Sequence, residues 1–245
     1  MRLVPLALVV LVLSACGGSS TADPGPQLTG ARAKTTAAGT AQFKLTIDAV
    51  VGGSTITAEE NGTASFSHRR AHLYKQIPGS PVPQELVLIG PYTYTNANVQ
   101  TALADPEVKP WTKLDTRRLT PTQIATQPDE LAHVLAPAYL ADGVATPTRV
   151  GRDEDGTTHF TGRVDPARLA GRVPASIFTA IRNDYSSKPF DADFWLDDGG
   201  RVRRVLVAYA TPQGSKITLD TRYSEFGTTI DVALPSPGEI ADISP

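Results

Sequence analysis

The sequence predicts an α+β fold, a single domain of about ten antiparallel strands interrupted by two helical insertions. Three observations predict this class. Apolar and polar residues alternate through many short segments, which is the pattern of half-buried strands. Two segments in the middle of the chain instead place apolar residues at helical spacing. The last third returns to alternation, and the order of strands, helices and strands fits one α+β domain.

The first block of strands begins at residues 43–48, where apolar side chains alternate with polar ones. Gly52-Gly53 turns the chain, and the alternation continues over residues 56–58. We predict a hairpin turn at Asn61-Gly62, because both residue types tolerate positive φ. Further strands are expected at residues 71–77, 85–89, 92–95 and 111–114.

Residues 120–143 are expected to be helical, because Asp129 and Glu130 suit a first turn and apolar residues follow at helical spacing. Pro137 should end or kink this helix. A second helix is expected from Pro174. Two apolar faces result, and such faces either line an apolar cavity or cap a solid core; the pattern by itself favours a core. The faces comprise Leu131, Val134, Leu135 and Tyr139 on the first helix, and Ile177, Phe178, Ile181 and Tyr185 on the second.

Strands are also expected on both sides of the second helix. Residues 146–151 and 158–164 are joined by a charged turn at 152–156, and Asp165-Pro166 is typical of a helix start. The last third of the chain predicts four more strands, at residues 192–196, 201–211, 215–226 and 230–234, before a tail that contains proline.

The N-terminus has the form of an export signal. Arg2 precedes an apolar run over residues 3–13, and small residues stand at Ser14 and Ala15. The run is too short to span a bilayer, which needs about 20 residues. Cys16 follows directly, and the arrangement resembles the bacterial lipobox, in which the thiol is diacylglycerylated and cleavage makes the cysteine the new N-terminus. The alternative is an ordinary signal with a chance cysteine or a buried core cysteine.

This interpretation divides the chain into three parts. Residues 1–15 form the lipoprotein signal peptide, residues 16–28 a polar tether rich in Gly, Ser and Pro, and residues 29–245 the folded domain. A weak helix is expected at residues 29–38. Two acyl chains on Cys16 would anchor the protein stably, so we expect an extracytoplasmic protein attached to the outer face of the cell membrane.

Composition narrows the classes of function. The chain of 245 residues carries 23 Lys and Arg against 25 Asp and Glu, a net charge of −2, so it has no strong field to attract nucleic acid. With a single cysteine, no intrachain disulfide can form. The apolar content of 40% is enough for one core. The excess of Arg over Lys and the abundance of Ala suit a GC-rich genome such as that of an actinobacterium.

Signals for catalysis are poor, since none of the common nucleophile, phosphate-loop or zinc motifs occurs. We expect no enzyme, no cofactor and no metal. His68 and His72 could bind a metal on one strand face, but no carboxylate lies near them in sequence and a solvated strand is the better interpretation. His133 is interpreted as a boundary residue and His159 as a strand residue. The acidic run at 153–155 is better explained by a hairpin turn than by a calcium loop.

Several strand and turn segments resemble a known family, the actinobacterial lipoproteins of the LppX/LprG type. The segments are Pro-Trp-Thr-Lys-Leu-Asp at 110–115, Phe-Trp-Leu-Asp at 194–197 with Gly-Arg-Val-Arg-Arg at 200–204, and Tyr-Ser-Glu-Phe-Gly at 223–227 with Ile-Asp-Val at 230–232 and Pro235. The resemblance runs loosely over residues 41–243 and contains no catalytic signature. That family is similar in fold to the LolA/LolB carriers, which form a curved antiparallel half-barrel with helices covering its concave face.

The resemblance implies a lipid-binding function. Acyl chains lie between the sheet and the helices in such proteins, and members move lipids or lipoglycans through the cell envelope. We therefore expect a lipid or glycolipid ligand in an apolar cavity lined by the eight helical residues named above, a membrane anchor at Cys16, and an envelope transporter as partner. Release would require the cover at residues 120–143 to move, with its prolines and Gly143 as breaks. The alternative is an envelope scaffold, sensor or protein-binding module with a filled half-barrel.

Overall fold

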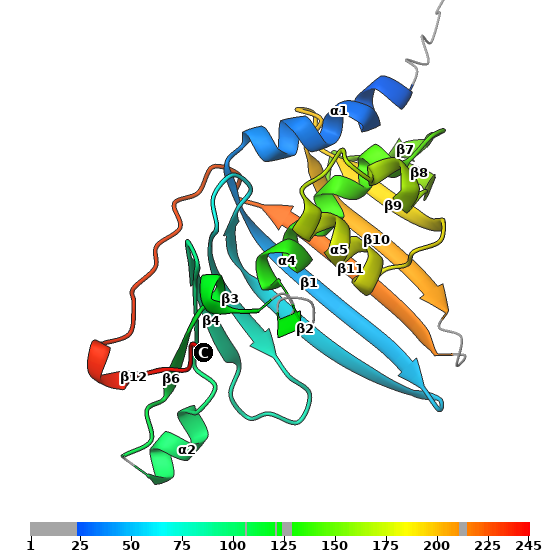
Figure 1. The fold of residues 1–245 in the computed structure, drawn as a ribbon. Coiled ribbons are helices and arrows are strands. Elements are labelled where there is room, and N and C mark those ends of the chain that lie inside the picture. The colour runs from blue at the N-terminus through cyan, green and yellow to red at the C-terminus, as the bar shows by residue number, and fades with distance from the viewer. Residues whose placement is uncertain (1–23, 106, 121, 124–128, 211–214) are drawn as a thin grey trace, which may run out of the picture.

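The computed structural model describes residues 24–245, apart from residues 106, 121, 124–128 and 211–214 (Figure 1). Over these residues, twelve strands form one open sheet in the order β12-β6-β5-β4-β3-β2-β1-β11-β10-β9-β8-β7. Neighbouring strands are antiparallel except for β12 and β6, which are parallel. The sheet curves without closing (Figure 1). The expected α+β half-barrel is confirmed, with more strands than the ten expected.

The elements follow one another in the order that the sequence predicts. The strands are β1 (Thr40–Val51), β2 (Ser54–Ser65), β3 (Arg70–Gln76), β4 (Gln84–Ile89), β5 (Tyr92–Thr95), β6 (Trp111–Asp115), β7 (Thr148–Arg152), β8 (Thr158–Val164), β9 (Phe190–Leu196), β10 (Val202–Ala210), β11 (Lys216–Ser224) and β12 (Ile240–Asp242). The α-helices are α1 (Pro24–Ala37), α2 (Val99–Ala104), α4 (Glu130–Tyr139) and α5 (Ala175–Asp184), and the short 3-10 helices are η1 (Thr116–Arg118), η2 (Leu140–Gly143), η3 (Pro166–Leu169) and η4 (Pro237–Glu239).

The helices α4 and α5 pack against each other over the concave face, in front of β1, β2, β10 and β11 (Figure 1). The inward side chains of these strands are apolar, as Phe43 and Leu45 on β1 show, and they join those of the helices in one core. Burial of this apolar surface is the main force that holds the cover on the sheet. We call α4, η2 and α5 the lid.

The helix α1 closes one end of the half-barrel, where it runs along the ends of the strands (Figure 1). Leu28, Ala31 and Thr35 on α1 are almost completely buried. The hydroxyl of Thr35 accepts a hydrogen bond of 2.8 Å from the backbone N–H of Val202, the first residue of β10. The helix begins at Pro24, earlier than the expected residue 29, because Leu28 already packs into the core.

The predicted hairpin turn at Asn61-Gly62 is wrong. Both residues lie inside β2, which pairs with β1 from Ser54 to Ser65, and the chain turns only after Ser65. Gly62 is required for another reason: a Cβ there would lie 2.0 Å from the carbonyl oxygen of His72 on β3. The glycine permits a close approach of two backbones in mid-strand, and such a glycine looks like a turn residue in the sequence.

The strand predicted at residues 230–234 is also wrong. These residues are described without secondary structure, and the tail pairs later, where β12 adds in parallel to the edge strand β6. A short parallel pair of Ile240, Ala241 and Asp242 with a distant strand leaves no local pattern in the sequence. The other predicted strands are confirmed, with β1 and β2 longer than expected.

The helical prediction over residues 120–143 is confirmed in its second half, where α4 is followed by η2. Asp129 caps α4, since its carboxylate accepts a hydrogen bond of 3.3 Å from the N–H of Ala132. Pro137 lies inside α4, and the α-helix changes to η2 three residues later. Residues 121 and 124–128 lie outside the described part. Asp165 caps a helix start as predicted, but the helix is the short 3-10 helix η3. Within the described residues, no helix has the length and apolarity needed to cross a membrane.

Candidate functional site

The lid is fixed to the sheet by hydrogen bonds from two tyrosines. Tyr223 on β11 donates from its hydroxyl to the carbonyl oxygen of Val134 on α4 at 2.8 Å. Tyr209 on β10 donates to the carbonyl oxygen of Asp184, the last residue of α5, at 2.9 Å. These bonds join a backbone carbonyl group of each helix to the sheet, so they set how each helix lies on it.

Seven of the eight residues predicted to line a cavity belong to the lid, and Tyr185 follows directly after α5. Seven are buried, and Phe178 is partly buried and packed against the core. Val134 and Ile181 are completely enclosed, with exposed fractions of 0%. Tyr185 stacks on Phe190, with ring centroids 5.7 Å apart. The spacing therefore identified the inward face of each helix correctly, while the lining of a ligand cavity stays a prediction.

Four of the eight residues meet at a pocket of about 230 Å³ at the edge of the lid. Leu131, Leu135 and Tyr139 of α4 and Ile177 of α5 line it, with Phe66 facing them from the turn between β2 and β3. The other four, Val134, Phe178, Ile181 and Tyr185, do not line it. We call this space the lid pocket. Its apolar lining comes from both lid helices and from the β2–β3 turn.

The mouth of the lid pocket is polar. Ser65, Ser67 and His68 from the β2–β3 turn border it, together with Arg69 and Asp129. The Arg69 guanidinium contacts the Asp129 carboxylate at 3.1 Å, through Nη1 and Oδ1. The Nε of Arg69 is buried and has no hydrogen-bond partner in the part of the chain that the structure describes. The Arg69 guanidinium therefore borders the lid pocket with one N–H donor that has no partner among the described residues.

Arg69 also borders a second, smaller pocket of about 140 Å³ below the start of α4. Leu86 and Leu114 line it with Glu130 and the side chains of Gln84, Thr93, Thr95 and Thr116. The Nη2 of Arg69 lies 3.4 Å from the hydroxyl of Thr93. The arginine thus borders two spaces on the concave side, each lined by both apolar and polar side chains.

Sequence reasoning missed a network of charged residues between the lid and the sheet. Lys75 on β3 forms an ion pair with Glu130 of α4 and lies 3.2 Å from Glu60 of β2. His133 of α4 lies 2.7 Å from Asp184 of α5 and 3.9 Å from Glu60. We call these five residues the latch. One signal was available: Glu60 falls on the inward side of an alternating strand, where a carboxylate needs a partner.

The latch contains a buried carboxylate, which is costly unless cations stabilise it. Glu60 is 8% exposed, and its Oε2 has no hydrogen-bond partner within the described residues. Burial alone lowers the pKa of His133, but the hydrogen bond with Asp184 and the charge of Glu60 outweigh it and raise the pKa above the usual value. Burial likewise opposes the charge of Lys75, and the carboxylates of Glu60 and Glu130 raise its pKa nevertheless. Both cations are therefore favoured in their charged forms.

The other histidines have local partners. The ring of His72 lies 2.6 Å from Glu85, a strand neighbour, and His68 lies in the turn before β3, so the two do not share a strand face. His159 on β8 contacts Asp193 at 3.0 Å and stacks on Trp195. The acidic run at 153–155 turns the β7–β8 hairpin, as predicted. The described residues contain no group of three side chains suited to hold a metal ion. Cys16 lies outside the described residues.

Comparison with known proteins gave matches among solved structures alone. No protein-family model and no curated protein matches the chain. LprF from Mycobacterium bovis aligns with 87% of this chain and 96% of its own, at 16% identity and a TM-score of 0.48. The Mycobacterium tuberculosis lipoprotein LppX aligns over 84% and 99%, at 15% identity and 0.47. A LolA superfamily protein from Nitrosomonas europaea aligns over 82% and 91%, at 11% identity and 0.35.

These neighbours are the kinds of protein that the sequence segments resemble, namely LppX/LprG-type lipoproteins and LolA-like proteins.

Proposed function

We propose that this protein is a lipoprotein of the cell envelope that binds the acyl moiety of a lipid or lipoglycan under its lid and carries or shelters it, without catalysis. The observation that carries the proposal is the lid pocket, which combines apolar side chains from both lid helices with Arg69, Asp129 and hydroxyl groups. An amphiphile has the matching chemistry, with an alkyl chain for the lining and a polar head for the mouth.

The driving force would be the burial of alkyl groups, worth about 0.8 kcal/mol for each methylene removed from water. A pocket of about 230 Å³ is smaller than the 300–1,000 Å³ typical of small-molecule sites, so a long chain would require the lid to shift. The change from α-helix to η2 at residue 140 offers a place where α4 could move relative to the rest of the chain.

The anchor at Cys16 would hold the domain close to the membrane. Seven residues lie between Cys16 and Pro24, where α1 begins, and the eight residue steps of an extended chain reach at most about 28 Å. Because α1 is packed into the end of the half-barrel, that end would face the bilayer. Labelling with an alkyne analogue of palmitate tests the anchor: we expect label on the natural chain and none after Cys16→Ala. An unlabelled natural chain would refute this part.

Blocking the mouth of the lid pocket tests the binding site. Ser176 lies on the exposed side of α5 and borders the pocket, whereas Thr179 is exposed on the same helix and does not border it. We expect Ser176→Trp to abolish the lipid that co-purifies with the protein, measured by mass spectrometry after solvent extraction. Thr179→Trp is the matched control and should keep it. Natural protein without stoichiometric lipid contradicts the proposal.

A second candidate function has its own support. The complete burial of Val134, Ala136 and Ile181 fits a filled half-barrel that serves as an envelope scaffold, sensor or protein-binding module. Phe178→Asp separates the two candidates, because Phe178 is only partly buried. If that face adjoins a lipid cavity, the variant should fold and lose lipid. If it caps a solid core, the buried charge should unfold the domain.

A further inference from the structure

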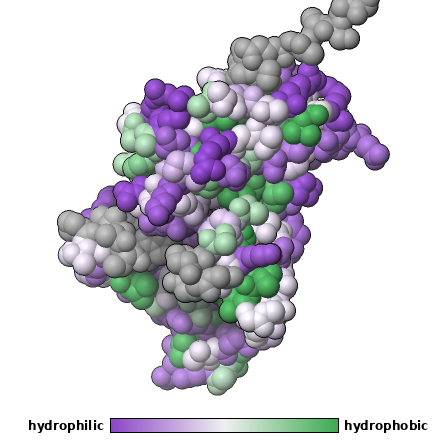
Figure 2. Space-filling view, turned by 90° about the vertical axis from the view of Figure 1, so that its right-hand side faces the viewer, coloured by the Kyte–Doolittle hydropathy of each residue, from purple (hydrophilic) through white to green (hydrophobic). Residues whose placement is uncertain are grey.

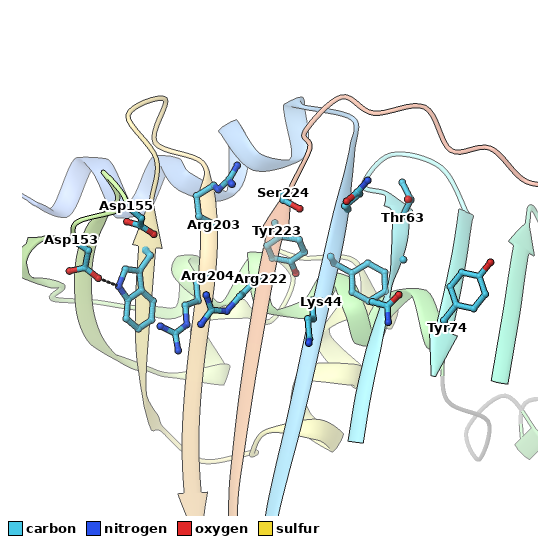
Figure 3. Close-up of a pocket in the computed structure, with 15 residues that line it drawn as sticks. Lys44, Thr63, Tyr74, Asp153, Asp155, Arg203, Arg204, Arg222, Tyr223 and Ser224 are labelled. Carbon is cyan, nitrogen blue, oxygen red and sulfur yellow. Dashed lines mark hydrogen bonds between the residues drawn. The ribbon is translucent and has the colours of Figure 1, made fainter. Parts of the chain in front are cut away.

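The outward face of the sheet, opposite the lid, carries a row of three cations on neighbouring strands. Arg204 on β10 pairs in register with Arg222 on β11, and Arg222 pairs with Lys44 on β1. Paired residues in adjacent antiparallel strands have Cα atoms about 4.5–5.5 Å apart. Figure 3 shows the three side chains next to one another on their strands. We call them the cation row.

Like charges at directly opposed positions destabilise a sheet, so the cation row has a cost in stability. Nearby carboxylates offset part of it. Asp220 accepts two hydrogen bonds of 2.8 Å from Arg204 and contacts Arg222 at 3.1 Å, so one carboxylate serves two guanidinium groups. Glu59 contacts Lys44 at 2.8 Å. Arg222 and Lys44 keep more than half of their side-chain surface exposed, at 56% and 51%.

The cation row lies in a groove of about 630 Å³, larger than either pocket beside the lid. Residues from β9, β10, β11, β1, β2 and β3 line it, which are six consecutive strands of the sheet. At about 4.8 Å between strands, the groove is roughly 24 Å long. Tyr74 stands at one end, and the β7–β8 turn with Asp153 and Asp155 stands at the other (Figure 3).

A second row of neutral polar side chains runs beside the cations. Ser224, Gln42 and Thr63 occupy paired positions on β11, β1 and β2, two residues along each strand from the cation row or its continuation. All three line the groove. Asn61 continues the cation row on β2, opposite Lys44. The groove therefore offers charged donors along one line and hydroxyl and amide groups along the next.

The charge of the groove differs from that of the whole chain. Its lining holds four cations, Lys44, Arg203, Arg204 and Arg222, against the two carboxylates at its end. Those carboxylates already have donors: Asp153 accepts from the indole N–H of Trp195 at 2.6 Å, and Asp155 accepts from Thr157. Arg204 and Arg222 share Asp220, and Lys44 has Glu59, yet Arg222 and Lys44 keep more than half of their side-chain surface exposed to a ligand. Guanidinium groups match the geometry of phosphate and carboxylate oxygens.

We propose that this groove binds a phosphate-bearing polyol or sugar chain, lying across the strands with its phosphates on the cation row and its hydroxyls on the neutral row. The site is on the opposite face from the lid pocket and stands independently of the lipid proposal. An alkyl chain does not suit it, because most of its lining residues are charged or polar. A flat bilayer surface does not fit either, because the groove is hollow and carboxylates form one end.

The test measures the binding of a short poly(glycerol phosphate) oligomer to the full chain purified in mild detergent, by isothermal titration calorimetry. We expect binding that weakens as salt is added, since charge pairs are screened. The double variant Lys44→Gln/Arg222→Gln should weaken binding at least tenfold. The control Arg149→Gln/Lys188→Gln removes the same charge from exposed positions outside the groove and should leave binding unchanged.

Three further probes identify the ligand class. A neutral dextran oligomer should not bind, and binding equal to that of the charged oligomer would refute a role for the cation row. Inorganic polyphosphate should bind more weakly than poly(glycerol phosphate), because it lacks the hydroxyls for Ser224, Gln42 and Thr63. Equal binding of the two would overturn the assignment to a polyol or sugar chain. Binding to phosphatidylglycerol vesicles without binding to the free oligomer would overturn it in favour of a membrane surface.

Discussion

Replacement of Lys75 by methionine should destabilise the protein strongly, because Lys75 is the cation that holds two carboxylates of the latch. Its side chain is 17% exposed and contacts Glu60 and Glu130 from below the lid. Methionine keeps much of the volume of the lysine side chain. It removes, however, the ammonium group that lies 3.2 Å from the buried Glu60 carboxylate. Breaking a buried ion pair by removing one partner costs about 3–5 kcal/mol. For a domain of this size, that corresponds to a fall in melting temperature of about 6–20 °C.

The assay is thermal unfolding followed by circular dichroism at pH 7. The double variant Lys75→Met/Glu60→Gln should recover part of the loss, because the neutral amide no longer needs a cation. Lys44→Met is the control, since Lys44 is half exposed and its pair with Glu59 should contribute less than about 1 kcal/mol. A Lys75→Met variant as stable as the Lys44→Met control would refute the role given to the latch.

Two further predictions concern the lid and the sheet. The raised pKa of His133 means that its charged form stabilises the fold below the unfolded pKa of about 6.5, and that this contribution disappears as pH rises through the higher folded value. The difference in unfolding free energy between the natural chain and His133→Asn, measured in urea, should therefore fall between pH 6 and pH 8; a constant difference would contradict it. Gly62→Ala should cost about 2 kcal/mol or more, because the added Cβ would lie 2.0 Å from the His72 carbonyl oxygen. Gly151→Ala is the control, because no atom lies within 4 Å of its added Cβ. Equal melting temperatures for the Gly62→Ala and Gly151→Ala variants would contradict the close approach of β2 and β3 at Gly62.

The tip of the β1–β2 hairpin is apolar and exposed, since Val50, Val51 and Ile56 are 37%, 51% and 49% exposed. Figure 2 shows areas of hydrophobic surface among hydrophilic ones on the right-hand side of the view in Figure 1. In Figure 1 the tip lies at the end of the sheet remote from α1. If the anchor holds α1 near the membrane, this tip would point away from it.

Alternation allowed most of the strands to be predicted, because each half-buried strand needs one apolar side and one polar side. The helical faces were equally accessible, and Leu131, Val134, Ile177 and Ile181 all point inward as their spacing predicts. The strand and turn predictions failed where the role of a residue depends on a neighbour that is distant in sequence. Gly62 accommodates the β3 backbone, and the β12 residues pair with β6 across more than 120 residues.

The candidate sites depended still more on long-range pairing. The latch joins Glu60, Lys75, His133 and Asp184, which lie far apart along the chain, and His133 looked like a boundary residue in the sequence. The cation row likewise joins Lys44 to residues 204 and 222. Neither group has a sequence motif, because register between strands and packing of helices bring its members together.

The sequence by itself determined the fold class, the inward faces of the strands and the lid, and an N-terminus that resembles a lipoprotein signal. These properties are local, since they follow from the periodicity and chemistry of neighbouring residues. The tertiary structure alone decided which polar residues meet: the latch under the lid, Arg69 between two pockets, and the cation row on the outer face. The physical reason is that the energy of a charge depends on its burial and its partners, and the fold decides both.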